Sequence, residues 1–511
     1  MIGGWKNRRR IKINNFRSLS MPEYIDIRPI TLLFGKNAAG KSSLIKAIKF
    51  LGHNLFPIQS GPTSFSLDKN NNLGDFEQII AYRDINKDIN IDFEEYWESF
   101  SENSERRESN IIHYELKTRF AYDQNEKNFK SLNIEDLVNR LRFNVFPDQK
   151  NNYDKEEING FFNKPVTPAK RAQSFNKLKD SQYGHAGYPN KNIEIGRSSY
   201  YNNSKLDKFI KYLDVLPFFN FNSDLQFSYY NQLSEYLDLN EEQYSAVSFL
   251  IQRFILDIPT LSKKFFNHWY VTPVRERPRN KYRLIGNRFD PKEYYGILNQ
   301  VDLRNETYNK YYPGNETQSD VLTFINATLF SFGLAKEFFI NKEKGFGSAH
   351  IVDLFDVEHN LAESSSGLIQ LLPIIVASFN ALYEYSDYVS MFDADYSTDV
   401  IIIEQPELHL HPALQTKLIE FISKSSGGTY IIETHSEHVV RKLQVLIAQG
   451  YRKENIAVYY FDKDNNIGVT SVKEMKFDDN GLFVDKWPEG FFDEKMKLTL
   501  ELLDSIKRRS N

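Results

Sequence analysis

Two spacings of apolar residues recur along the first part of the chain, one typical of strands and one typical of helices. Apolar and polar residues alternate at residues 10–16 and 89–93, and a denser apolar run occupies residues 25–34, so each segment is predicted to be a strand. A glycine-rich turn follows the second of these, and an apolar-periodic helix is predicted from about residue 40 to residue 51. This order of elements favours an α/β fold.

The second half of the chain predicts a similar alternation. Strands are expected at residues 268–274, 400–403 and 429–432, and the β-branched run at 400–403 is typical of a buried parallel strand. The helical spacing predicts helices at residues 321–332, 366–382, 413–423 and 437–449. Strands and helices that alternate in this way predict a parallel sheet with helices packed on it.

Composition changes between these two parts. Residues 94–205 are rich in Asn, Lys, Glu, Ser and Tyr, and we interpret them as an insertion, helical at residues 134–143 and otherwise largely loop. A helical pattern returns at residues 209–261. Residues 164–179 carry five basic side chains and no acid, which fits either a flexible basic arm or a solvated loop.

The overall composition excludes several classes of protein. With 511 residues, 41% of them hydrophobic, the chain is expected to form two to four lobes at about 100–200 residues per domain. No cysteine is present, which excludes disulfides, thiolate metal sites and cysteine nucleophiles. The longest apolar run is far shorter than the ~18–20 residues of a membrane span, and no signal peptide is evident, so a cytoplasmic protein without a membrane partner is expected. The net charge of -4 argues against a uniformly basic nucleic-acid binder but leaves room for a local basic patch.

The glycine-rich turn at residues 35–42 fits the pattern G-x-x-x-x-G-K-[ST] and lies between a predicted strand and a predicted helix. Glycines let the backbone fold around an anion with its N–H groups inward, and the helix N-terminus adds partial positive charge. Lys41 would reach the β- and γ-phosphates, and Ser42 would bind Mg²⁺. The predicted nucleotide-binding residues of this P-loop are Gly35, Lys36, Asn37, Ala38, Ala39, Gly40, Lys41, Ser42 and Ser43.

Three further motifs lie near predicted strand ends or helix starts. Glu404 ends the buried strand at 400–403 and is expected to hold Mg²⁺ together with Ser42. His435 ends the next strand, where it could sense the γ-phosphate and the attacking water or be a satisfied loop histidine. A second anion-binding surface, or an ordinary serine N-cap, is formed by Ser365, Ser366 and Gly367.

The turn after Glu404 contains one acid and two histidines within a few residues. Glu407, His409 and His411 could bind zinc, but the segment is better explained as a turn that meets a partner subunit.

These motifs together resemble a known family. Residues 35–42, 364–370, 401–412 and 433–438 are similar to the motifs of ABC-type ATPases related to RecF, the SMC heads and the OLD nucleases. Residues 270–275, 332–336 and 487–494 resemble a bacterial subgroup with a C-terminal domain of unknown function. Many such ATPases belong to anti-phage defence operons, among them the Septu ATPase subunit and retron-associated relatives.

The resemblance implies an ABC-type P-loop ATPase head with a mixed or parallel sheet, split by a long insertion. Glu404 follows Lys41 by 363 positions (404 − 41), far more than a compact P-loop enzyme needs, which agrees with a split head. The expected segments are 1–93 for the first part of the head, 94–264 for the insertion, 265–345 for a return to the head, 346–485 for its second part and 486–511 for a tail.

The resemblance also implies the chemistry. ATP and Mg²⁺ would be the cofactors, the catalytic set would be Glu404, Gln405, Glu407 and His435, and Ser365–Gly367 would contact the γ-phosphate bound by another protomer of a homodimer or higher oligomer. Related ATPases carry a catalytic Glu where Gln405 stands. Because an amide cannot accept a proton, either Glu407 is the base or hydrolysis is slow.

Three functions remain open at this stage. The first is a dimerising ATPase that regulates or delivers a partner nuclease, of the HNH type if the protein is Septu-like, in anti-phage defence. The second is a non-hydrolysing nucleotide sensor and scaffold, which Gln405 favours. The third is a RecF-like DNA-repair ATPase. The acid pairs Asp462/Asp464 and Asp393/Asp395 are poorly placed for an OLD-like nuclease, so a nuclease is expected to be a partner.

Every second residue from 275 to 283 is basic. In an extended segment this places Arg275, Arg277, Arg279, Lys281 and Arg283 on one face, where they would bind DNA or RNA phosphates or simply be solvated. Pro278 restricts this basic segment to an edge or a loop. The resemblance of residues 273–275 to the family implies a competing role for Arg275 inside the head. The nucleic-acid contact is therefore assigned to Arg277, Arg279 and Lys281.

Overall fold

The computed structural model describes the parts of the chain that form the sheets and the predicted site. These are residues 8–55, 76–81, 84, 86–100, 109–123, 128–136, 141–146, 191–197, 218–221, 269–273, 275, 277–285, 288–289, 298, 301, 320–389, 400–425, 428–464, 468–487 and 494–510. The basic run at 164–179, the pair Asp393/Asp395 and most of the helical pattern at 209–261 lie outside them.

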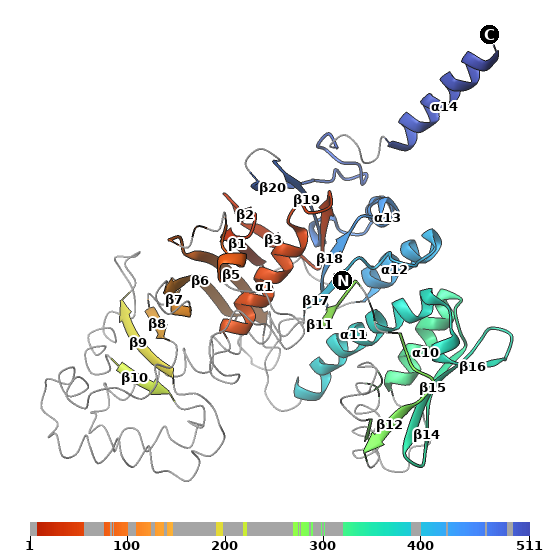
Figure 1. Cartoon of the computed structure of the whole chain (residues 1–511), viewed down its shortest axis with the longest axis horizontal. Coiled ribbons are helices and arrows are strands. Elements are labelled where there is room, and N and C mark those ends of the chain that lie inside the picture. Colours follow the sequence, from red (N-terminus) through yellow and green to blue (C-terminus); the bar gives the residue numbers. More distant parts are fainter. Residues whose placement is uncertain are drawn as a thin grey trace, which may run out of the picture.

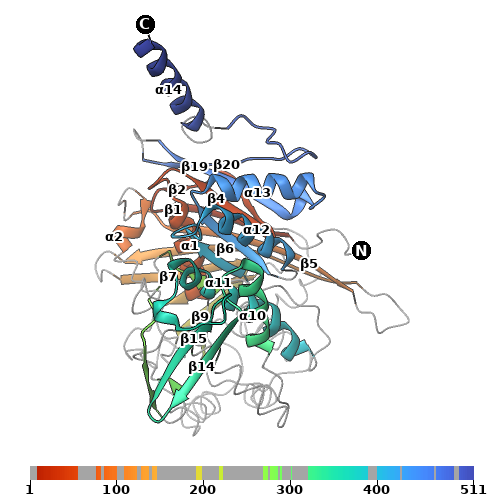
Figure 2. The same cartoon turned by 90° about the vertical axis from the view of Figure 1, so that its right-hand side faces the viewer.

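Among the described residues, 15 strands form one mixed sheet (Figures 1 and 2). One end of this sheet consists of parallel neighbours, in the order β11 (Trp269–Val271), β17 (Val400–Glu404), β18 (Thr429–Thr434), β4 (Ile30–Gly35) and β19 (Ile456–Lys463). Beyond β19 the sheet continues through β20 (Thr470–Glu474), β2 (Leu19–Ser20) and β1 (Arg8–Phe16), and neighbours there pair antiparallel except β2 with β20. A mixed sheet with helices between its parallel strands confirms the predicted α/β class.

The parallel end of the sheet forms because its strands are apolar along their length. β4, β17 and β18 are buried at every position, as expected of parallel strands covered on both faces. Helix α12 (Pro412–Lys424) connects β17 to β18, and α13 (Glu437–Ala448) connects β18 to β19. Helix α1 (Lys41–Leu55) follows β4 and packs on β4 and β1. The predicted strands β11, β17 and β18 and the predicted helices α1, α12 and α13 are confirmed, with bounds shifted by at most four residues.

The single strand predicted at residues 25–34 is wrong. β3 (Ile25–Ile27) pairs antiparallel with β1 (Arg8–Phe16), whereas β4 leaves that neighbourhood and lies between β18 and β19. The chain turns between β3 and β4 at residues 28–29, where Pro29 cannot donate to a ladder. The apolar pattern is continuous through residues 25–34, so it gave no sign that β3 and β4 are separate strands with different partners.

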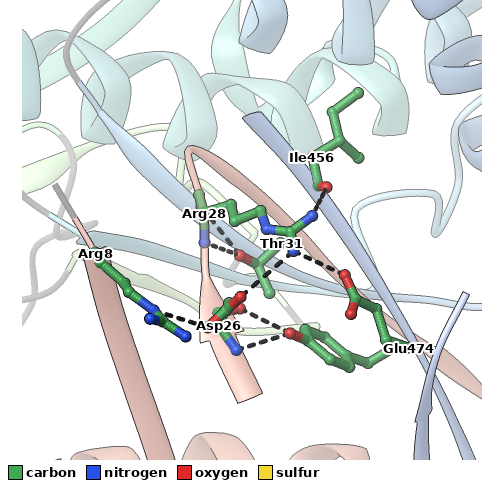
Figure 3. Close-up of polar contacts among 7 residues, drawn as sticks. Arg8, Asp26, Arg28, Thr31, Ile456 and Glu474 are labelled. Atoms are coloured by element: carbon green, nitrogen blue, oxygen red, sulfur yellow. Dashed lines mark hydrogen bonds and ion pairs between the residues drawn. The ribbon is translucent and has the colours of Figure 1, made fainter. Parts of the chain in front are cut away.

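A polar network holds this turn in place (Figure 3). The Arg28 guanidinium donates to the carbonyl oxygen of Ile456 and to Glu474, both at 2.8 Å. Thr31 Oγ1 accepts a hydrogen bond of 2.8 Å from the Arg28 backbone N–H. Asp26 lies between Arg8 and Arg28, at 3.7 Å and 3.4 Å respectively. These contacts attach the start of β4 to the strands β19 and β20, at the end of β4 opposite to the P-loop.

The segment after residue 93 extends the main sheet instead of interrupting it. β5 (Ile89–Phe100) pairs with β1 and runs through the predicted boundary at residues 93 and 94. The helix predicted at residues 134–143 is wrong, because strands lie there whose sequence alternates with a period of two, as at Leu141, Phe143 and Val145. The further antiparallel strands are β6 (Ser109–Asp123), β7 (Asn128–Asp136), β8 (Leu141–Phe146), β9 (Lys191–Arg197) and β10 (Phe218–Phe221). β10 also replaces part of the helix expected at 209–261. The rest of the five-segment division remains a prediction.

A second, smaller sheet lies beside the first (Figure 1). Its strands are β12 (Tyr282–Ile285), β13 (Arg288–Phe289), β14 (Glu337–Glu343), β15 (Phe346–Val352) and β16 (Glu358–Asn360). Helix α10 (Asp320–Phe332) packs on β14 and on α11 (Ser366–Val389), and α11 also packs on β11 and β17 of the main sheet. Buried residues of both sheets belong to one hydrophobic cluster, so α10 and α11 join the two sheets into one body.

The C-terminal part begins with a hairpin of β19 and β20 (Thr470–Glu474), which β2 (Leu19–Ser20) joins at the far side. Short helices complete the described elements: α2 (Phe76–Ile79), η5 (Leu361–Glu363) and η6 (Lys453–Asn455). Helix α14 (Glu494–Ser510) extends away from the body (Figures 1 and 2). No helix among the described residues has the length and apolar character needed to cross a membrane.

Candidate nucleotide-binding site

The P-loop joins β4 to α1 and is shaped by close packing against β19 and β20. Gly35 has a φ of 141°, and a Cβ there would lie 2.1 Å from the Phe461 carbonyl oxygen of β19. Gly40 has a φ of 102°, and a Cβ there would lie 2.5 Å from Thr470 Oγ1. Both positions therefore require glycine, for backbone conformation and for space. At the rim of the loop, Lys36 pairs with Asp462 at 3.2 Å, the acid considered above for a nuclease.

Lys41 lies folded inside the loop that it follows. Its side chain is only 3% exposed, and Nζ donates to the carbonyl oxygens of Gly35 at 3.0 Å and Lys36 at 2.7 Å. Burial lowers the pKa of Lys41, and the charges of Glu433 and Glu407 oppose that shift. The ammonium is thus a buried cation, held by backbone oxygens at the position where a P-loop lysine meets phosphate.

Ser42 is paired with an acid that the sequence interpretation did not select. Its hydroxyl lies 2.8 Å and 3.0 Å from the two carboxylate oxygens of Glu433, at the end of β18. Glu433 is 3% exposed and stands level with Glu404 on the adjacent strand β17. Burial raises the pKa of Glu433, and the hydrogen bond from Ser42 opposes this rise. The expected pairing of Ser42 with Glu404 is not among the hydrogen bonds of the described residues.

Glu404 lies one strand farther from the P-loop than Glu433 and has other partners. The Tyr270 hydroxyl on β11 donates to Glu404 Oε1 at 2.9 Å, and the Lys49 ammonium lies 3.7 Å from the centre of the Tyr270 ring. Burial raises the pKa of Glu404, while the Tyr270 hydrogen bond and the charges of Lys46 and Lys49 act against it. Its role as the Mg²⁺ ligand remains a prediction.

The turn after β17 is strained at two residues without being glycine-rich. Gln405 has a φ of 46° and His409 a φ of 62°, both in the left-handed region. The Gln405 N–H donates to the Glu433 carbonyl oxygen at 2.7 Å, which fixes the start of the turn to β18. Strain of this kind is frequent at functional sites. Gln405 directly follows Glu404 in the chain, and its backbone is held beside Glu433.

Glu407 uses both carboxylate oxygens to hold the end of β18. Thr434 Oγ1 donates to one oxygen and the His435 backbone N–H to the other, each at 2.7 Å. His411 accepts a hydrogen bond from the Ala413 N–H at the start of α12. Glu407 and His411 therefore have separate tasks, and the described residues contain no group of three or more His, Cys, Asp and Glu side chains arranged to hold a metal ion.

His435 connects the end of β18 to the P-loop. Burial and the charge of Lys41 lower the pKa of its imidazole, whereas a hydrogen bond to the Gly35 backbone acts in the opposite direction. The Gly35 carbonyl also accepts from Lys41. The proposed γ-phosphate sensor thus lies beside the P-loop, as its role requires.

The predicted signature at residues 364–370 begins helix α11. Ser365 and Ser366 are exposed, and Ser365 Oγ accepts from the Leu368 N–H at 3.4 Å, so this serine also acts as an N-cap. Gly367 is buried against the turn after β17, where a Cβ would lie at ordinary contact distance, 3.6 Å from Leu414 and 3.7 Å from the His409 carbonyl oxygen. No hydrogen bond among the described residues joins these serines to the P-loop of the same chain.

Arg275 lies inside the head, so the basic segment does not present five cations on one face. This residue is 7% exposed, and its guanidinium donates to Gln370 Oε1 of α11 and, at 3.4 Å, to the carbonyl oxygen of Glu404. This link connects the signature helix to the acidic strand. The exposed members of the basic segment are Arg277, Arg279, Lys281 and Arg283.

The residues present fit both predicted cofactors. A glycine loop with inward backbone groups and a buried lysine at a helix N-terminus suits a polyphosphate. Mg²⁺ prefers hydroxyl, carboxylate and phosphate oxygens, and the hydroxyl of Ser42 lies against one buried carboxylate with a second on the next strand. The site could therefore hold a nucleotide together with its Mg²⁺.

Residues 9–440 match the family described as the AAA ATPase domain. The chain belongs to this family. Residues 452–502 match a second family, a protein family of unknown function designated DUF3696. The comparison with curated proteins gives no match.

Solved structures of SMC heads align with most of the chain at low similarity. A head domain from Pyrococcus furiosus, bound in its structure to the C-terminal domain of ScpA, has a TM-score of 0.39, 10% identity and 98% coverage of both chains. A head domain from Thermotoga maritima has a TM-score of 0.34 and 10% identity, covering 92% of this chain and 99% of that chain. One from Pyrococcus yayanosii has a TM-score of 0.38 and 9% identity, with coverages of 92% and 97%. Scores of this size carry no argument, so the ATPase assignment rests on the family match and the site geometry.

Three site residues were missed by the sequence interpretation: Tyr270, Gln370 and Glu433. Glu433 had a signal that could have been used, because it directly follows the apolar run at 429–432, just as Glu404 follows the run at 400–403. Acids that end adjacent parallel strands lie at the same edge of a sheet. Tyr270 and Gln370 carried no such signal, since their importance depends on contacts with distant segments.

Proposed function

We propose that this protein is an ATP hydrolase whose heads engage in pairs around ATP and Mg²⁺. The P-loop of one protomer would face Ser365, Ser366 and Gly367 of the other, in a homodimer or a higher oligomer. The observation that carries the proposal is the orientation of the signature: its serines are exposed at the start of a long helix, while Gln370 below them is tied through Arg275 to the acidic strand. An exposed helix start anchored to the catalytic strand suits a phosphate brought by another subunit.

Hydrolysis by this site is expected to be slow. Glu404 would bind Mg²⁺ and His435 would contact the γ-phosphate, but Gln405 can orient a water molecule without accepting its proton. Glu407, the alternative base, already accepts hydrogen bonds with both oxygens. The same two observations favour a second candidate, a nucleotide sensor and scaffold that binds ATP without turnover.

The partner that we propose is a nuclease, of the HNH type if the protein is Septu-like, regulated or delivered by head engagement in cytoplasmic anti-phage defence. Support comes from the resemblance of the motifs to defence ATPases. Arg277, Arg279 and Lys281 are exposed and would contact DNA or RNA phosphates during that task.

Native mass measurement with and without ATP and Mg²⁺ tests the engagement of heads. The mass is expected to double or increase further with ATP, because the γ-phosphate would connect two protomers. Ser366→Arg should prevent this increase and retain ATP binding, since it fills the surface that receives the phosphate. Ser331→Arg, an exposed serine on α10, serves as the matched control. A mass that ATP leaves unchanged would contradict the proposal.

A further inference from the structure

The edge of the sheet beside the P-loop carries two buried carboxylates where one was expected. Glu433 and Glu404 are register partners on β18 and β17, and they are 3% and 7% exposed. Because β18 lies between β17 and β4, Glu433 belongs to the strand directly beside the P-loop strand. The acid nearest to the phosphate cradle is thus Glu433.

The two acids also have different hydrogen-bond partners, and those of Glu433 belong to the P-loop region. Tyr270 donates to Glu404, and Lys46 and Lys49 lie close enough to interact with its charge. Glu433 accepts hydrogen bonds from the hydroxyl of Ser42, in the first turn of α1, at 2.8 and 3.0 Å. The charge of Glu433 interacts with Lys41 and Lys46, and Lys41 is the lysine expected to meet the phosphates.

We propose that Glu433 makes ATP binding by this protein depend on a divalent cation. The inference rests on the proposed binding of ATP by the P-loop. A triphosphate in this loop would bring several negative charges next to a buried carboxylate, and charge repulsion is much stronger in a buried site than in water. It would also compete with Glu433 for Lys41. A divalent cation shared by Ser42, Glu433 and the phosphates removes this conflict, and Mg²⁺ is commonly held by one or two carboxylates plus substrate phosphates.

The test is a comparison of ATP affinities measured by calorimetry on the full chain, once in excess Mg²⁺ and once in EDTA. Coupling between two ligands usually amounts to about 5–150-fold, and a value near the upper end is expected for the unaltered protein. Glu433→Gln should reduce the gain from Mg²⁺ to below about tenfold, chiefly because binding in EDTA becomes tighter. The amide keeps an acceptor for the Ser42 hydroxyl and loses only the charge.

Three further variants make the result specific. Glu420→Gln removes the same charge from the surface of α12 and should leave the gain from Mg²⁺ unchanged. Glu404→Gln should lower the gain less than Glu433→Gln does. Ser42→Ala removes the hydroxyl between the loop and the acid, and it should also lower the gain. If Glu433→Gln does not fold, as judged by circular dichroism, Ser42→Ala decides the question.

Three outcomes would overturn the inference. The first is a full Mg²⁺ gain in Glu433→Gln, or in Ser42→Ala if that variant decides. The second is a gain abolished by Glu404→Gln and retained by Glu433→Gln. In both of these the proposed ATP binding would stand. The third is an unaltered protein that binds no ATP in either condition, and only that outcome would remove the proposed function together with the inference.

Discussion

The P-loop and the basic segment are both suited to phosphate, but they are built in opposite ways. The P-loop is a buried cradle in which two glycines contact β19 and β20 and the cation Lys41 is held by backbone oxygens. The basic segment, at the edge of the smaller sheet, presents exposed side chains from residues 277–283. Buried charges are screened little by salt and depend on geometry, whereas exposed charges are screened strongly and depend on number. The first region is therefore suited to one defined ligand, and the second to any phosphate backbone.

The largest effect is expected from Lys41→Ala. This change removes the buried cation of the P-loop, and charge-assisted hydrogen bonds contribute about 1.5–3 kcal/mol each, so ATP affinity should fall by at least about 100-fold. Calorimetry measures the affinity, with Lys424→Ala on the exposed end of α12 as control. An unchanged affinity would show that this loop is not the nucleotide cradle.

Gly35→Ala compared with Gly345→Ala separates the effect of packing from that of backbone conformation. Both glycines have positive φ, but a methyl at Gly35 meets the Phe461 oxygen, and a methyl at Gly345, in the β14–β15 turn, meets nothing within 4 Å. Gly345→Ala should cost about 1 kcal/mol of unfolding free energy. Gly35→Ala should cost roughly 2–5 kcal/mol and weaken ATP binding. Urea denaturation measures the unfolding free energy of both variants. Equal losses of unfolding free energy would mean that the close contact of Gly35 with β19 adds nothing to the cost of the left-handed backbone.

Gln405→Glu tests whether ATP hydrolysis at the P-loop is slow because a general base is missing. A carboxylate can accept the proton of the attacking water, and general base catalysis typically contributes about 10²–10⁴-fold, so turnover should rise by at least tenfold. If Glu407 is the base instead, Glu407→Gln should remove whatever turnover exists. Steady-state phosphate release measures both variants. If neither substitution changes the ATPase rate, the attacking water does not lie beside Gln405 or Glu407.

The smallest effect is expected from replacing Arg277, Arg279 and Lys281 together with Ala. Each phosphate contact contributes about 0.7–0.9 to the slope of log affinity against log salt, so nucleic-acid binding should weaken for all sequences alike and its slope should flatten by up to about 2–3. ATP affinity should not change. The control replaces Lys424, Arg441 and Arg452, exposed cations of the C-terminal half of the head. Equal slopes in the two triple variants would mean that the basic segment is only solvated charge.

Local patterns alone determined the nucleotide cradle and the parallel end of the sheet. The P-loop motif spans eight residues, and the strands and helices around it follow from periods of two and 3.6 within short windows. Contacts between residues far apart in the sequence could not be predicted from such short windows. Residues 134–136 and 141–143 form strands because antiparallel neighbours on both sides complete their hydrogen bonds, although the local pattern also fits a helix.

Tertiary structure alone decided which acid meets Ser42, and it decided between the two positions that the sequence left open for Arg275. The sequence identified Glu404, because it ends a β-branched strand, but the insertion of β18 between β17 and β4 brings Glu433 to the P-loop instead. For Arg275 the sequence left two roles open, one on the basic face and one inside the head, and packing against α11 holds the residue inside the head. The physical reason is the same in both cases. Residue type and spacing specify what a side chain can do, whereas strand order and packing specify which partner it meets, 391 positions away for Ser42 and 95 for Arg275.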